Sequence, residues 1–144
     1  MKKLLLSFVA LFAASAVFAQ GQSTIYSENF NNGIPTGWTQ LNAGSDGGFL
    51  AGTATALSSQ YFPFTDPGSN FVGTNDDGCN CTKNDEYLVT DSMDLSNYSV
   101  LHATFKSFFF GATYSGATEV AEFKYTTNGG STWTSLGSLN PGAD

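Results

Sequence analysis

The chain lacks arginine altogether, and its 144 residues hold five lysines and one histidine against 12 acidic residues. Two of the lysines stand at positions 2 and 3, so the part after residue 19 has three lysines against 12 acids and a net charge of −9. A surface that binds nucleic acid or an anionic membrane needs lysine and arginine to neutralise phosphates. The sequence therefore argues against nucleic acid as a partner and favours cation binding or solubility outside the cell.

The residues of common catalytic sites are scarce as well. The single histidine, His102, falls in the middle of an expected strand, and no Gly-x-Ser-x-Gly elbow is present. Paired carboxylates serve glycosidases, but the acids here lie in loops rich in glycine and asparagine, which suit metal binding better. We therefore expect a protein that is not an enzyme.

The one long apolar run lies at the N-terminus. Lys2 and Lys3 precede apolar residues 4–18, and Val17-Phe18-Ala19 is typical of a signal-peptidase site. About fifteen apolar residues fall short of the ~20 that a membrane-spanning helix needs. We expect residues 1–19 to be a signal peptide cleaved after Ala19, and residues 20–144 to form one secreted or cell-surface domain without a membrane span.

Strand formers and turn formers alternate after residue 20, and helix formers are few, which is typical of an all-β domain. The alternation predicts strands at residues 23–30, 70–74, 85–90, 101–110, 118–127 and 132–136. Their spacing indicates a β-sandwich. The turn at residues 31–38 is expected to deliver Trp38 to the core, although Trp38 could instead be a platform for sugar stacking. The hairpin turn at residues 128–131 is expected to place Trp133 in the core.

Residues 73–96 contain half of the acidic residues and both cysteines, which form a Cys79-Asn80-Cys81 triplet. In an exported protein we expect this pair to form a local disulfide, with free thiols or pairing between molecules as the alternative. Zinc would need four ligands, and only His102 remains to help. A redox-active pair usually has two intervening residues.

Three stretches together resemble the cleaved-adhesin and choice-of-anchor J domains of secreted Bacteroidetes proteins. They are residues 28–38 (Glu-Asn-Phe-Asn-Asn-Gly-Ile-Pro-Thr-Gly-Trp), residues 75–96, and residues 123–133 (Phe-Lys-Tyr-Thr-Thr-Asn-Gly-Gly-Ser-Thr-Trp). Asp91 and Met93 depart from the family pattern. The resemblance implies a MAM-like jelly-roll β-sandwich that acts as a non-catalytic adhesion or recognition module. Because the family continues with further strands, we expect a domain truncated at its C-terminal end, with an unpaired strand edge that favours association.

The resemblance also implies structural calcium. The expected ligands are carboxylates of the first strand and the central loop, with an amide or a further acid completing the oxygen shell: Glu28, Asp76, Asp77, and Asn75 or Asp85. The alternative is a solvated acidic loop.

The expected partner is an extracellular protein or glycan, contacted by the loop aromatics Tyr61, Phe62 and Tyr114. Two other functions stay open. One is a carbohydrate-binding module, and the other is an accessory fragment of a secreted peptidase or other enzyme.

Overall fold

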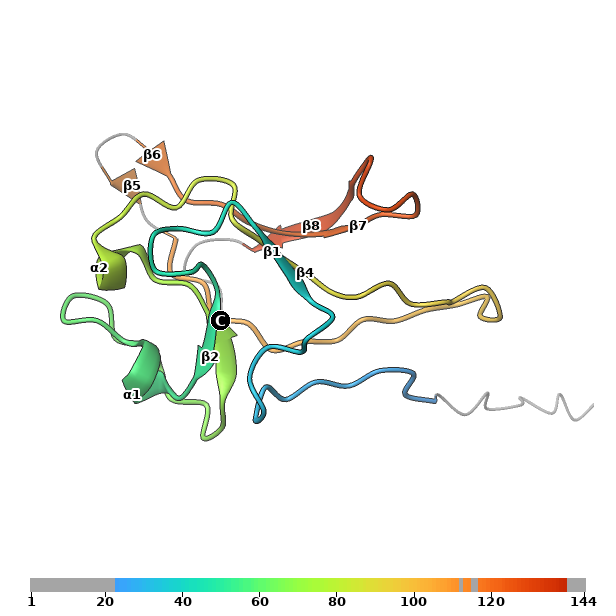
Figure 1. The fold of residues 1–144 in the computed structure, drawn as a ribbon, viewed down its shortest axis with the longest axis horizontal. Coiled ribbons are helices and arrows are strands. Elements are labelled where there is room, and N and C mark those ends of the chain that lie inside the picture. Colours follow the sequence, from blue (N-terminus) through green and yellow to red (C-terminus); the bar gives the residue numbers. More distant parts are fainter. Residues whose placement is uncertain (1–22, 112, 115–116, 140–144) are drawn as a thin grey trace, which may run out of the picture.

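The computed structural model describes residues 23–111, 113–114 and 117–139. The expected signal peptide and residues 140–144 lie outside the described residues. The strands are β1 Thr39–Leu41, β2 Leu50–Gly52, β3 Phe71–Gly73, β4 Tyr87–Val89, β5 Thr113–Tyr114, β6 Ala117–Thr118, β7 Ala121–Tyr125 and β8 Thr134–Leu139. Two four-residue helices, α1 Ala54–Leu57 and α2 Asp76–Cys79, complete the elements (Figure 1).

The strands pair two at a time, and every pair is antiparallel: β1 with β4, β2 with β3, β5 with β6, and β7 with β8. Strands were expected where β3, β4, β7 and β8 lie, and the β-rich class is confirmed. Within the described ranges each sheet has two strands. The sandwich and its jelly-roll order therefore remain predictions.

The turn between β7 and β8 is held by its own side chains. The Asn128 amide nitrogen donates to Thr132 Oγ1 at 2.8 Å, and the Asn128 side-chain oxygen accepts from the Thr132 amide at 3.0 Å. Thr126 Oγ1 accepts from the Gly130 amide at 3.0 Å. Gly129 and Gly130 have φ of 66° and 87°. Residues with a side chain rarely adopt these angles, whereas glycine does so readily. The Asn-Gly-Gly signal thus predicted a rigid hairpin.

Two expected strands are wrong. The described backbone forms no strand at residues 23–30 or 101–110. Figure 1 shows the chain leaving β4 toward a turn at residues 95–98 and then returning, and the Tyr98 amide donates to the Leu95 carbonyl at 3.1 Å within that turn. Alternating apolar residues make a strand only where a neighbouring backbone supplies its hydrogen bonds, and residues 101–110 have no such ladder.

Packing is concentrated in a phenylalanine cluster made of Phe62, Phe64, Phe71, Phe108 and Phe110. Its ring centroids lie 5.2 to 6.4 Å apart, mostly in tilted or edge-on pairs, the arrangements that aromatic quadrupoles favour. Among the described residues Ala54 in α1, 6% exposed, is the one buried apolar side chain. The cluster therefore joins the segment between α1 and β3, β3 itself and the segment after residue 100.

Candidate functional site

Helix α2 lies in the acidic loop, and three of the expected calcium ligands have a role at its start. Asn75 is its N-cap, and the Asn75 side-chain oxygen accepts from the Gly78 amide at 3.2 Å. Asp76 and Asp77 form the first turn and are exposed. Carboxylates there interact favourably with the free amides and partial positive charge of a helix start. The Asn-Asp-Asp run is thus a helix-start signal that sequence reasoning missed.

The two cysteines form the expected local disulfide at the end of α2. Cys79 and Cys81 are bonded with Cα atoms 5.1 Å apart. Between them, Asn80 takes a left-handed φ of 50° as the helix C-cap, and its amide donates to the Asp76 carbonyl. Asparagine tolerates this conformation better than most residues, so the Cys-Asn-Cys triplet suits a helix end closed by a disulfide.

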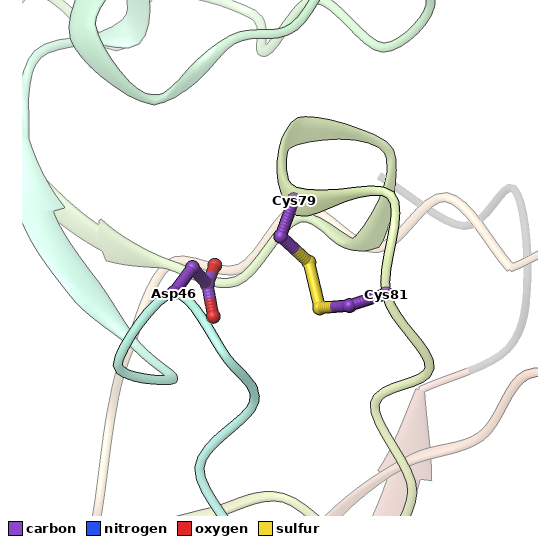
Figure 2. Close-up of side chains that lie close together, drawn as sticks. All are labelled: Asp46, Cys79 and Cys81. Atoms are coloured by element: carbon purple, nitrogen blue, oxygen red, sulfur yellow. A yellow bond between two sulfur atoms is a disulfide. The ribbon is translucent and has the colours of Figure 1, made fainter.

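Asp46 comes from a different loop and faces this disulfide (Figure 2). Its carboxylate and the two sulfur atoms lie within 4.8 Å of one another, and within the described part of the chain this is the one grouping of three such side chains able to surround a metal ion. Cysteine binds zinc as a thiolate, whereas both sulfurs here are committed to a disulfide. The grouping acts here as a contact between the loop and α2.

A nearly buried ion network adjoins the disulfide. Lys83 Nζ contacts both oxygens of Asp46, at 2.8 and 2.9 Å, and Oε1 of Glu86 at 3.4 Å. The Lys83 and Glu86 side chains are 7% and 4% exposed. Glu86 also accepts hydrogen bonds from the Gly44 amide, at 3.0 Å, and from the Thr74 hydroxyl. One ammonium thus faces two carboxylates, and Glu86 gains its further partners from neutral donors, so each charged group has the polar contacts that burial requires.

The network sets the electrostatics and the space around Asp46. The hydrogen bond from Lys83 lowers the pKa of Asp46, and the amide of Gly48 adds to the effect. A Cβ at Gly44 would lie 3.1 Å from Asp46 Oδ1, 3.3 Å from Cys81 Sγ and 3.4 Å from Lys83 Nζ. Only a glycine backbone approaches these three groups so closely without displacing one.

The remaining expected calcium ligands lie elsewhere. Glu28 accepts from the amides of Asn29 and Phe30, at 2.9 and 2.7 Å, so its carboxylate closes a local turn. Asp85 is exposed and has a φ of 52°. None of the expected acids belongs to the three-residue grouping around Asp46. The structure thus gives four of the five residues local roles at a helix start or a turn, and the calcium site stays a prediction.

The three expected ligand-binding aromatics differ in their surroundings. Tyr61 is 77% exposed, the highest value among the large hydrophobic side chains described. Phe62 is half-buried in the phenylalanine cluster. Tyr114 belongs to β5, but its side chain lies outside the described part. Tyr61 alone of the three is seen to project from the surface.

A second site, missed by sequence reasoning, lies where the β1–β4 and β7–β8 pairs meet. Leu41, Tyr87, Lys124 and Trp133 line a pocket of about 140 Å³. Trp133 is 41% exposed rather than buried as expected, because its ring borders this open pocket and does not enter the phenylalanine cluster. Lys124 Nζ lies 5.7 Å from the centre of the Tyr87 ring.

No family model, curated protein or solved structure matches the chain. Among the described residues, no helix has the length and apolar character needed to cross a membrane. We therefore infer the function from the surfaces around Tyr61 and Trp133 and from the disulfide at the end of α2.

Proposed function

We propose that the mature chain is a non-catalytic recognition module that works outside the cell and binds an extracellular protein or glycan. The adhesin-like reading of the sequence leads to this function, and the exposed Tyr61 is the observation that carries it. The proposal includes a MAM-like jelly-roll sandwich, for which the antiparallel, β-rich structure is partial support.

Tyr61 is exposed on a well-anchored loop. The Ser59 amide donates to the Phe62 carbonyl at 3.0 Å, and the Phe62 amide donates to Ser59 Oγ at 3.0 Å. The rings of Phe62 and Phe64 pack 5.3 Å apart immediately after it. A tyrosine presented on a fixed backbone loses little conformational entropy on binding, which is why such residues carry much of the energy of recognition.

The disulfide supports the extracellular location. Cys79 and Cys81 are both oxidised in the structure, and disulfides persist mainly in oxidising compartments. The expected signal peptide at residues 1–19 points the same way. Structural calcium remains a prediction, and thermal unfolding of the mature chain with calcium and with chelator tests it. A rise in Tm that Asp76→Ala abolishes would support an ion at this loop.

The recognition function is tested by biolayer interferometry of the mature chain on immobilised extracellular matrix proteins and mucin glycans. We expect saturable binding to at least one ligand, weakened about tenfold or more by Tyr61→Ser, since a central aromatic anchor contributes about 2 kcal/mol or more. Tyr98→Ser, at another exposed tyrosine, is the matched control. Binding that ignores Tyr61, or no binding to any ligand, would refute the proposal.

A carbohydrate ligand is the second candidate, because the pocket at Tyr87 and Trp133 combines exposed rings with charged polar groups.

A further inference from the structure

The pocket beside Trp133 is assembled from segments far apart in the sequence. Leu41 and Tyr87 stand opposite each other across the β1–β4 ladder, while Lys124 lies in β7 and Trp133 immediately precedes β8. Since both strand pairs contribute, the pocket forms only when the two pairs come together. Its small volume, about 140 Å³, is well below the ~300–1,000 Å³ of drug-sized sites, so it suits a single ring.

The apolar part of the pocket is open to solvent. Leu41, Tyr87 and Trp133 are 46%, 37% and 41% exposed. The ring of Trp133 lies beside Gly130, with its Cζ2 3.7 Å from where a Cβ of that residue would stand. The hydrogen bonds between Thr126, Asn128 and Thr132 fix that hairpin. The turn that precedes Trp133 is therefore ordered before any ligand arrives, which lowers the entropic cost of binding.

The polar group that lines the pocket is Lys124, and it pairs with Glu122, which stands beside the pocket and is not one of its lining residues. Lys124 Nζ lies 2.6 Å from Glu122 Oε2, with side-chain exposures of 26% and 36%. The pair supplies donors and acceptors side by side, while its net charge is zero. In the mature chain, which carries a net charge of −9, an anionic ligand would find no uncompensated cation among these pocket residues and would be repelled by the overall field.

A pyranose ring has C–H groups on one face, which pack on aromatic rings, and hydroxyl groups around its edge, which bind a paired donor and acceptor. We propose that Tyr87, Trp133 and the Lys124–Glu122 pair form a subsite for one uncharged pyranose ring of a glycan. This inference rests on the proposed recognition function and names a ligand class and a second surface, separate from Tyr61.

The chain offers a direct optical test, because its only tryptophans are Trp38 and Trp133. In a Trp38→Phe variant of the mature chain, all tryptophan emission comes from Trp133. We expect saturable quenching or a spectral shift on titration with uncharged hexasaccharides of β-linked glucose, xylose or mannose, with Kd in the millimolar range or tighter. Acidic oligosaccharides of galacturonate should give no saturable change.

Calorimetric titration of the unmutated mature chain with the same sugars identifies the residues. Trp133→Ala should weaken binding at least about tenfold, a loss of about 1.4 kcal/mol, and Lys124→Met, which keeps the apolar stem, should weaken it measurably. Val120→Ser, at an exposed position outside the pocket, should leave binding unchanged. If Trp133→Ala fails to fold by circular dichroism, Lys124→Met and the tryptophan emission decide.

The proposal is overturned if no uncharged sugar binds up to about 10 mM, a Kd well beyond useful affinity, if only acidic sugars bind, or if Trp133→Ala and Lys124→Met bind as the unmutated chain does. The proposal is also overturned if Trp133→Ala abolishes the binding of a protein ligand and leaves the binding of glycans unchanged. Absence of sugar binding with Tyr61-dependent protein binding intact would remove the subsite and leave the recognition function standing. Absence of both would remove both.

Discussion

At the scale of single residues, Lys83 is the cation that two carboxylates share. It contacts Asp46 and Glu86, and its side chain is almost fully buried. Removing one partner of a buried ion pair leaves the other charge uncompensated, which costs far more than an exposed pair is worth. The stability of the loop that carries Asp46 therefore depends on Lys83, which is distant in the sequence.

Lys83→Met tests that dependence. We expect it to lower the free energy of unfolding by about 3 kcal/mol, because Glu86 keeps its burial and loses its cation. Urea denaturation followed by circular dichroism measures the change. The exposed Lys106→Met serves as the control and should change stability by less than about 0.5 kcal/mol. An equal, small effect of both substitutions would show that the network contributes nothing.

The lowered pKa of Asp46 makes a prediction about acid. Its carboxylate is stabilised in the folded state by Lys83, so this contribution is present above the unfolded pKa of 3.8 and is lost as pH falls through the lower, folded pKa. The Asp46→Asn variant should therefore be less stable than the unmutated chain at neutral pH. Its Tm should also fall less steeply than that of the unmutated chain as the pH drops below about 4. Parallel Tm–pH profiles for the two proteins would contradict this role.

At the scale of elements, helix α2 is held by a cap at one end and a disulfide at the other. The loop that the disulfide closes is very short, so the entropy it removes from the unfolded chain is small. In the chain-entropy treatment it stabilises by about 1.5 kcal/mol. The disulfide therefore shapes the acidic loop more than it determines whether the domain folds.

Reduction should accordingly leave the mature chain folded but less stable by about 1.5 kcal/mol, as urea denaturation with and without a dithiol reductant will measure. The double variant Cys79→Ser, Cys81→Ser should have the reduced protein's stability and should not respond to reductant. Titration of free thiols in the untreated, denatured protein should find none. Two titratable thiols would mean that the cysteines are not paired in solution.

At the scale of the whole molecule, many large hydrophobic side chains are exposed, and Ala54 is the one buried apolar residue among those described. In the described structure β8 pairs with β7 alone, so its other edge is free to pair. Exposed apolar side chains and free strand edges both favour association. Association through an unpaired strand edge stays a prediction, and these features give it a physical basis.

We therefore expect the mature chain to self-associate with rising concentration, as sedimentation velocity between micromolar and hundred-micromolar samples would reveal. Leu136→Lys, at a β8 position that is 66% exposed, should shift the equilibrium toward monomer because a charged edge strand resists pairing. Val120→Lys, an exposed position outside the strands, should have a smaller effect. A monomer at every concentration would contradict the prediction.

The candidate sites were only partly predictable. The disulfide and the hairpin before Trp133 followed from local chemistry, because Cys-Asn-Cys and Asn-Gly-Gly act within a few residues. The calcium set depended on bringing Glu28 to α2, which no local pattern specifies. Trp133 was expected in the core since tryptophans in hairpins usually pack inward, but its partners, Leu41 and Tyr87, come from another strand pair.

The sequence by itself determined the β-rich class, the turns, the paired cysteines and the acidic charge, because each depends on residue type or on neighbours along the chain. Only the tertiary structure decided that Lys83 joins Asp46 to Glu86 and that Trp133 remains open beside Tyr87 and Lys124. It also decided that residues 101–110 form no strand. These outcomes depend on which distant backbone supplies hydrogen bonds and which distant side chains cover a surface. Local sequence patterns specify neither of these.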